Sequence, residues 1–274
     1  MSELKVGIIG QGRSGYRIHA RTLKQKSGAY RIAAVSDPDE GYRRRAVEEF
    51  GCDAYADYKQ LLERTDLDLI VNASPSHLHV PLTLECLAAG FNVVCEKPLA
   101  RTAEEVDALI EAAEKSGKLL TVFQQSRYLP GYQEILRLLG TGRFGRVVQV
   151  SFAFNGFARR WDWQTLQANN GGSLLNTGPH PLDQILHLVG SNEMPKITCY
   201  LDRVNTFGDA EDYVKLIMKW NDGPVADLEI SSCDAYSPVK YRIQTQYGGI
   251  SGDVDRLKWK YYDPEKAPKQ QLIR

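Results

Sequence analysis

The fold is decided by the stretch Lys5-Val6-Gly7-Ile8-Ile9-Gly10-Gln11-Gly12-Arg13-Ser14-Gly15. Its apolar first half is typical of a short buried strand, and its second half is a G-x-G-x-x-G pattern that opens a predicted helix. In a dinucleotide-binding βαβ unit, the first glycine permits a tight turn, the second lets the backbone approach a pyrophosphate, and the third allows close helix packing. The helix N-terminus offers N–H groups to the phosphates. The predicted cofactor-binding residues of this loop are Gly10, Gln11, Gly12, Arg13, Ser14 and Gly15.

Asp37 indicates which dinucleotide binds. It stands 22 residues (37 − 15) beyond the last glycine, at the end of the second predicted strand. A carboxylate in that place accepts hydrogen bonds from the ribose hydroxyls of NAD and repels the extra phosphate of NADP. A contact from Arg43 or Arg44 nearby would soften this preference. NAD is therefore the predicted cofactor, and NADP the less favoured one.

Strand-like and helix-like segments alternate up to about residue 122. The candidate strands are Lys5 to Ile9, Arg31 to Ser36, Leu67 to Asn72, Asn92 to Cys95 and Leu119 to Phe123. The candidate helices cover about 14–26, 40–50, 80–89 and 102–116. Thr102 and Glu105 form a capping-box pattern at the start of the last helix. This alternation predicts an α/β fold, with a doubly wound parallel sheet of the Rossmann type in residues 1–122.

The pattern changes after Arg127, where strands predominate. One helix is expected at about 131–139 and another from Pro181. The expected strands are 146–154, 196–204, 213–220, 225–232 and 241–247, followed by a weakly patterned polar tail after Tyr262. Residues 123–274 are therefore predicted to form an α+β domain whose open, mostly antiparallel sheet is packed on one face by helices.

Composition narrows the class of partner. The 274 residues include 34 basic and 34 acidic side chains, so the charge of a nucleic-acid binder is absent. The chain shows neither a signal-peptide pattern nor the roughly 18 consecutive apolar residues of a membrane span. Its five cysteines are scattered and odd in number, which favours reduced thiols in the cytoplasm. We expect a cytoplasmic protein without a nucleic-acid or membrane partner.

The apolar run from Phe91 to Cys95 ends abruptly in Glu96, Lys97 and Pro98. In a parallel sheet the carboxyl ends of the strands open onto the ligand crevice, which places Glu96 and Lys97 beside the cofactor. Lys97 is thereby predicted to be a catalytic amine that also touches the substrate. Pro98 fixes the local backbone, and a cis peptide bond before it is one way of doing so.

Ser74, Pro75 and His79 follow the third predicted strand and are placed at the cofactor as well. Two interpretations of His79 stay open: it caps the following helix or fills a gap, or it contacts the nicotinamide half of the dinucleotide. A metal site is not expected here, because no further ligand is near in sequence.

A second group of small and polar residues runs from Asn169 to Asp183. Within it His180, Asp183, Gln184 and His187 have the spacing of one helical face, which makes zinc binding conceivable but leaves capping and core packing as the simpler interpretation. His180 stands at the helix entrance, and an imidazole suits proton transfer at neutral pH. Oxidising an alcohol requires a group that takes the hydroxyl proton and one that stabilises the alkoxide. We expect His180 to take the proton and Lys97 to stabilise the alkoxide. Asn176 can only donate and accept hydrogen bonds.

Trp161 and Trp163 precede this group. An aromatic face suits the apolar C–H face of a sugar ring, and the polar rim of such a ring suits hydrogen-bonding neighbours. Packing at the junction of the two domains is the equally weighted alternative for each tryptophan.

The chain resembles the family of glucose-fructose oxidoreductase, inositol dehydrogenase and MocA (Gfo/Idh/MocA). The matching positions are Gly10 to Gly15, Asp37, Ser74 to His79, Glu96-Lys97-Pro98, Ser126-Arg127-Tyr128 and Gly171 to Asp183. The resemblance implies a Rossmann domain followed by a domain whose open sheet shields the substrate cleft and forms a homodimer or homotetramer. It implies NAD(P)-dependent oxidation or reduction of sugars, polyols and inositols. It places catalytic positions at Lys97, Asn176 and His180, and a substrate contact at Arg127.

Two departures from the family pattern affect the expected function. Asn176 replaces the commoner aspartate, so the proton transfer rests on His180 with Lys97, and relatives usually continue with C-terminal elements beyond a point like Arg274. The main hypothesis is an NAD-dependent oxidoreductase acting on a sugar, sugar derivative or cyclitol. The alternatives are an NAD-dependent glycosidase that oxidises its sugar transiently and a non-catalytic NAD-binding sensor.

Overall fold

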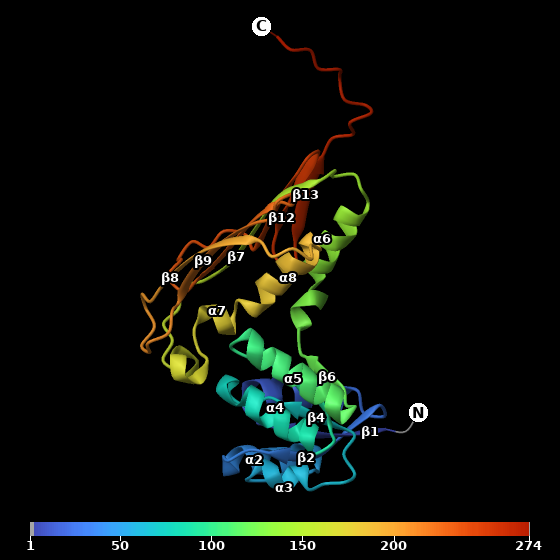
Figure 1. The fold of residues 1–274 in the computed structure, drawn as a ribbon, viewed down its shortest axis with the longest axis vertical. Helices are drawn as coiled ribbons and strands as arrows, with labels where there is room; N and C mark the ends of the chain where they lie inside the picture. Colours follow the sequence, from blue (N-terminus) through green and yellow to red (C-terminus); the bar gives the residue numbers. More distant parts are fainter. Residues whose placement is uncertain (1–2, 274) are drawn as a thin grey trace. The chain divides into compact units, whose positions relative to one another are not determined.

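The computed structural model describes residues 3–273, which form two compact units (Figure 1). The first unit holds the chain up to Gln124 together with Ala168–Asn170, and the second holds the rest. The sequence placed the boundary between residues 122 and 123, two residues earlier, and did not assign the short 168–170 segment to the first unit.

The first unit is built on a sheet of six parallel strands in the order β3-β2-β1-β4-β5-β6. Their bounds are β1 Leu4–Ile9, β2 Tyr30–Ser36, β3 Asp53–Tyr55, β4 Leu69–Asn72, β5 Asn92–Cys95 and β6 Leu120–Val122. This order is that of a dinucleotide-binding doubly wound sheet, whose ligand crevice lies where the order reverses beside the first strand. The predicted Rossmann architecture is thus confirmed.

Helices cover both faces of this sheet, because two separate apolar clusters form, one against each face. The helical segments are η1 Arg13–Ala20, α1 Arg21–Gln25, α2 Glu40–Phe50, α3 Tyr58–Leu62, η2 Ser76–Leu78, α4 His79–Ala88 and α5 Ala103–Ser116. The expected capping box is present at the start of α5, where Thr102 Oγ1 accepts from Glu105 N and the Glu105 carboxylate accepts from Thr102 N. The single helix expected over 14–26 is instead a π-helical segment, η1, continued by α1.

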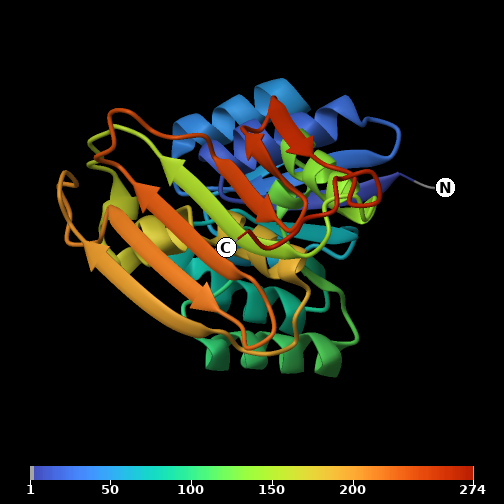
Figure 2. The same cartoon turned by 90° about the horizontal axis from the view of Figure 1, so that it is seen from above.

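The second unit contains a seven-stranded sheet in the order β13-β12-β11-β7-β10-β9-β8 (Figure 2). The bounds are β7 Val147–Asn155, β8 Lys196–Asp202, β9 Tyr213–Lys219, β10 Val225–Ser231, β11 Tyr241–Thr245, β12 Gly248–Gly252 and β13 Leu257–Tyr261. Only the β7–β10 pair is parallel, which confirms the mostly antiparallel sheet. The last two strands were not predicted, since glycines interrupt the alternation in β12.

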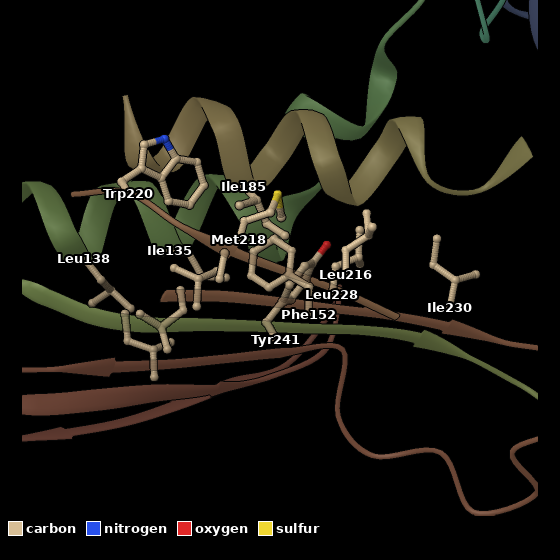
Figure 3. Close-up of a cluster of buried hydrophobic side chains, with 14 of the residues drawn as sticks. Ile135, Leu138, Phe152, Ile185, Leu216, Met218, Trp220, Leu228, Ile230 and Tyr241 are labelled. Carbon is tan, nitrogen blue, oxygen red and sulfur yellow. The ribbon is translucent and has the colours of Figure 1, made fainter. Parts of the chain in front are cut away.

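Helices pack on one face of this second sheet (Figure 3). The helical segments are η3 Gln125–Tyr128, α6 Pro130–Gly140, η4 Trp163–Thr165, η5 Gln167–Asn169, α7 Ser173–Asn176 and α8 Pro179–Val189. Ile135 of α6 and Ile185 of α8 are fully buried against strand residues such as Leu228, and alternate residues of β9 point away from them. Apolar burial on this face is what fixes α8, and with it the second group of candidate site residues.

Candidate functional site

Two of the three glycines in the nucleotide loop are required by the protein's own packing. Gly10 has φ +88°, and a Cβ atom there would overlap with the carbonyl oxygen of Ala73. A Cβ atom on Gly15 would overlap with the carbonyl oxygen of Gly10. These two positions therefore form the tight turn and the close helix packing that the loop pattern predicts.

Gly12 is different, because a Cβ atom there would meet no protein atom within 4 Å. Packing within the chain does not explain this glycine, whereas a pyrophosphate lying against the backbone does. Gly12 is also the N-cap of η1, so the N–H groups of that helical end face the same place. Beside it, Gln11 is fully buried, and its Oε1 has no hydrogen-bond partner among the described residues. The loop fits a dinucleotide.

Asp37 lies directly after β2 and is 9% exposed. Its Oδ2 accepts from the backbone N–H of Gln11 at 2.7 Å, and its Oδ1 accepts from that of Asp39 at 2.9 Å. A carboxylate accepts about four hydrogen bonds, so both oxygens keep capacity for ribose hydroxyls. Arg43 donates to the carbonyl oxygens of Asp37 and Pro38, and the Arg44 guanidinium pairs with Glu40. Both arginines that were expected to soften the preference for NAD thus have other partners.

Arg45 is a residue of this site that the sequence did not single out. Its Nη2 donates to the carbonyl oxygen of Gln11 at 2.7 Å. Its guanidinium carbon lies 3.6 Å from the ring centroid of Tyr16 and 4.9 Å from that of Tyr42. Arg45 therefore holds the backbone of the glycine loop from α2, through one hydrogen bond and a stacked cation–π contact.

A buried amide organises the loop after β4. Asn72 is fully buried, and its Nδ2 donates to the carbonyl oxygen of His79 and to Thr83 Oγ1. The Oδ1 of Asn72 accepts from Ser74 Oγ at 2.7 Å. This network explains how Ser74, and Pro75 after it, are held at the carboxyl edge of the sheet.

His79 is 1% exposed at the start of α4, and each of its ring nitrogens faces a backbone carbonyl. Nδ1 lies 2.6 Å from the oxygen of Pro98, and Nε2 lies 3.0 Å from that of Ser74. Burial lowers the pKa of His79, and the two carbonyl contacts oppose that lowering, since a neutral ring donates to only one of the two oxygens and a protonated ring donates to both. These contacts make His79 a brace between two loops, while its contact with the nicotinamide half stays a prediction.

Glu96 and Lys97 follow β5 at the same edge of the sheet. Glu96 is 4% exposed, and its Oε2 accepts from the backbone N–H of Lys97 at 3.2 Å. The peptide bond between Lys97 and Pro98 is cis, as the sequence suggested. The predicted catalytic lysine thus extends from a backbone that its neighbouring carboxylate holds.

In the second unit, most of the predicted helical face turns out to be structural. Arg127 forms a two-pronged ion pair with Asp183, with N–O distances of 2.8 and 2.7 Å. Gln184 is fully buried and donates to the carbonyl oxygen of Ser126, and His187 Nδ1 lies 2.7 Å from the Tyr132 hydroxyl. Across residues 3–273, no group of three His, Cys, Asp or Glu side chains is arranged to hold a metal.

Asn176 and His180 belong to two successive helix ends. Glu211, which the sequence did not reveal, accepts from the backbone N–H of Leu174 at 2.8 Å and fixes the start of α7. A Cβ atom on Gly172, which has φ +101°, would overlap with the Glu211 carboxylate. Asn176 ends α7, and its Oδ1 accepts from Gln164 Nε2 at 3.1 Å. His180 is half-buried in the first turn of α8.

The second unit also has a surface pocket of about 460 Å³. It is lined by Arg159, Arg160, Trp161, Asn205 and Phe207. Trp161 and Phe207 are 79% and 84% exposed, so the lining of this pocket brings two exposed aromatic residues together. Trp163 does not line this pocket and is 39% exposed on η4.

The turn that carries Asn205 and Phe207 is built around Asp212, which is 2% exposed. Its carboxylate accepts from the backbone N–H groups of Val204, Asn205 and Thr206, each at 2.7 Å. Burial alone raises the pKa of Asp212, but these three hydrogen bonds together hold it below the usual value for an aspartate. One ionised side chain therefore shapes a wall of the pocket.

Comparison with known proteins finds a matching family model for each of the two units. Residues 4–124 match a family model described as an oxidoreductase family with an NAD-binding Rossmann fold, and residues 132–251 match one described as a GFO/IDH/MocA C-terminal domain. The first match confirms the predicted cofactor. None of the helices described in residues 3–273 is long and apolar enough to span a membrane.

Two similar curated proteins differ in their named activities. Inositol 2-dehydrogenase 2 of Saccharopolyspora erythraea is 30% identical over 253 residues, which are 90% of this chain and 73% of that protein. The 2,7-anhydro-N-acetylneuraminate hydratase of Mediterraneibacter gnavus is 28% identical over 262 residues, covering 93% and 68%. A structure of the WlbA dehydrogenase from Bordetella pertussis, in complex with NADH and UDP-GlcNAcA, has a TM-score of 0.87 at 23% identity and covers 96% of this chain and 85% of that one. At that identity it supports the fold alone.

The glycine loop predicts opposite effects for two alanine substitutions. Gly12→Ala adds a methyl group where the protein leaves space, so the variant should fold normally and bind NADH at least tenfold more weakly, as measured by NADH fluorescence titration. Gly15→Ala, the matched control, should instead lower the melting temperature because its Cβ atom overlaps with Gly10. Unchanged NADH affinity in Gly12→Ala would contradict the assigned loop.

Asp212 predicts a pH-dependent contribution to stability. Because its pKa is lower in the folded than in the unfolded chain, its stabilisation is present above the unfolded pKa and is lost as pH falls. Asp212→Asn should cost about 1–3 kcal/mol at pH 7 in urea unfolding. That difference should shrink below about pH 4. The exposed Asp222→Asn serves as the control, and an Asp212 effect of equal size at pH 7 and pH 3 would refute the assignment.

Proposed function

Because the chain belongs to the Gfo/Idh/MocA family of oxidoreductases, we propose that it transfers a hydride between NAD(H) and a hydroxyl or carbonyl carbon of a sugar, sugar derivative or cyclitol. The observation that carries this proposal is the edge of the first sheet. Three strands of this parallel sheet are each followed by a candidate site residue. Gly12, with its open backbone, follows β1, the Asp37 carboxylate follows β2, and Lys97 follows β5.

Oxidation of an alcohol removes a proton from oxygen and a hydride from carbon. NAD, when bound, supplies the hydride acceptor. His180 is proposed to take the hydroxyl proton, since an imidazole with an ordinary pKa of about 6.5 accepts protons readily at neutral pH. The same group returns the proton when a carbonyl is reduced.

Lys97 is proposed to stabilise the alkoxide as the proton leaves. An ammonium group presents three N–H donors and a full positive charge to the developing negative oxygen. Asn176 cannot accept a proton, so its role is to orient the substrate through hydrogen bonds. Its Oδ1 already accepts from Gln164, which fixes the orientation of the amide.

The substrate ring is proposed to contact Trp161, Trp163 and Arg127. The pocket at Trp161 offers an aromatic face to the C–H side of a sugar, with Arg159 and Asn205 available to its hydroxyl rim. Two of the five N–H groups of Arg127 donate to Asp183, and another is proposed to donate to a substrate hydroxyl.

Transient oxidation is the second candidate function. Similarity to a protein named as a hydratase favours it, because that activity involves no net oxidation. In this alternative the sugar would give up a hydride to bound NAD, and the new carbonyl would acidify the C–H on the neighbouring carbon. Loss of that proton would expel the leaving group from the next carbon, water would add to the resulting double bond, and the hydride would return to the carbonyl. A glycosidase working this way releases its product without accumulating NADH.

We propose a cytoplasmic homodimer or homotetramer formed through the second sheet. The free cysteines support the reducing compartment, and exposed apolar residues of the sheet support association. Ile217 is 40% exposed on the face opposite the helices, and Tyr200 of the edge strand β8 is 59% exposed. Light scattering of the purified protein measures the assembly, and a monomer would contradict it.

Lys97→Met provides the decisive test of the mechanism. In a panel of sugars, polyols and inositols, the wild-type protein should produce NADH absorbance at 340 nm with at least one substrate. The variant should lose about 100-fold or more in kcat, because the alkoxide loses its charged donor. Lys115 is an exposed lysine of α5, and Lys115→Met should behave as the wild type.

Full activity of Lys97→Met would disprove the assigned role of Lys97. Glycoside cleavage without net production of NADH would favour the second candidate function. Tight NADH binding without any turnover would favour a sensor.

Trp161→Ala tests the substrate pocket. Loss of one stacking face worth about 0.5–1.5 kcal/mol should raise KM for the sugar by roughly two- to tenfold and leave kcat nearly unchanged. Trp161→Phe keeps an aromatic face and should retain most of the affinity. An unchanged KM in the alanine variant would remove this pocket from the substrate site.

A further inference from the structure

His19 forms a buried link that the proposed mechanism does not use. It lies on η1, the helical segment that begins at the glycine loop, and is 6% exposed. Its Nε2 is 2.9 Å from Oε1 of Glu96, whose own exposure is 4%. The His19 ring also packs against that of Phe123 at a tilt of 58°, with ring centroids 4.4 Å apart. His19 therefore joins the first helical segment to the ends of β5 and β6.

The two oxygens of Glu96 have different partners. Oε1 faces His19, and Oε2 accepts from the backbone N–H of Lys97 at 3.2 Å. An ionised carboxylate only accepts hydrogen bonds, so Nε2 of His19 must carry the hydrogen between them. A buried carboxylate without such a donor is costly, which ties the position of Glu96 to His19.

We propose that His19 is a positioning residue for Lys97: it holds the Glu96 carboxylate, whose second oxygen holds the backbone from which the Lys97 side chain extends. This inference rests on the proposed function only where it concerns turnover. It further implies that the glycine loop and the lysine segment are mechanically connected through one imidazole. Segments of π-helix occur often at functional sites, and here η1 carries His19 within reach of Glu96.

The charges around Glu96 support this arrangement. Burial raises the pKa of Glu96, but the hydrogen bond and charge of His19, with the charge and N–H of Lys97, together hold it below the usual value for a glutamate. His79 and the thiol of Cys95 are the other titratable groups that sense its charge. Without His19, fewer groups would counteract the rise in the Glu96 pKa that burial causes. Glu96 should then take up a proton at a higher pH.

His19→Phe is the principal test, because phenylalanine keeps the ring against Phe123 and removes the hydrogen-bond donor. With the oxidisable substrate found above, kcat should fall at least tenfold while the substrate KM stays within threefold. A loss of rate that follows protonation of Glu96 should begin at a higher pH than in the wild type, in addition to the loss that follows protonation of the proposed base His180. His19→Gln places an amide donor near the position of Nε2 and should recover most of the rate. Phe123→Leu removes the ring packed against residue 19 and no hydrogen bond, so it should lower stability without moving the pH profile.

A second measurement is independent of turnover and of bound cofactor. In the ligand-free protein labelled with ¹³C at glutamate carboxyl carbons, the Glu96 signal is assigned by its loss in Glu96→Gln. Its titration should move to higher pH in His19→Phe and return toward the wild type in His19→Gln. An unmoved Glu96 titration, or an unchanged kcat despite a moved one, would overturn the inference. Absence of sugar oxidation in the wild type together with a moved titration would refute the proposed function while leaving the carboxylate link intact.

Discussion

All six strands of the first sheet run in the same direction, and this single constraint determines where chemistry is possible in that unit. Parallel strands place their carboxyl ends along one edge. The glycine loop, Asp37, the Ser74 loop and Lys97 each follow a different strand, so they gather at that edge although up to 87 residues (97 − 10) separate them in sequence. The helices on both faces leave this edge as the place for a dinucleotide.

Buried polar contacts then fix the loops at that edge. Asn72 holds the turn after β4, His79 joins it to Pro98, and Asp37 and Arg45 hold the two backbone groups of Gln11. Each contact satisfies a donor or acceptor that would otherwise be costly in a dry environment. Such a network keeps the loops in one arrangement before any ligand binds, which is the preorganisation that hydride transfer needs.

In the second unit, apolar packing and an ion pair hold the backbone of the candidate site residues. The apolar side of α8 is buried against the sheet, and the Arg127–Asp183 pair and the buried Gln184 join the first turns of α8 to η3. Glu211 and the glycines before α7 fix the preceding turn. Asn176 and His180 therefore stand on a firm backbone, while the exposed rings of Trp161 and Phe207 stay available to a ligand.

The sequence by itself determined the Rossmann half, the mostly antiparallel second sheet, the capping box at Thr102 and the identity of the cofactor. These depend on local rules: periodicity of apolar residues, glycine spacing and the residue at the end of a strand. Tertiary structure alone decided the π-helical form of η1, the strands β12 and β13, and the roles of Arg45, Asn72, His19 and Glu211. Each of those roles depends on a partner distant in sequence, such as Glu96 for His19, 77 residues away. No local pattern encodes such a pairing, because it exists only once the sheet has brought the two segments together.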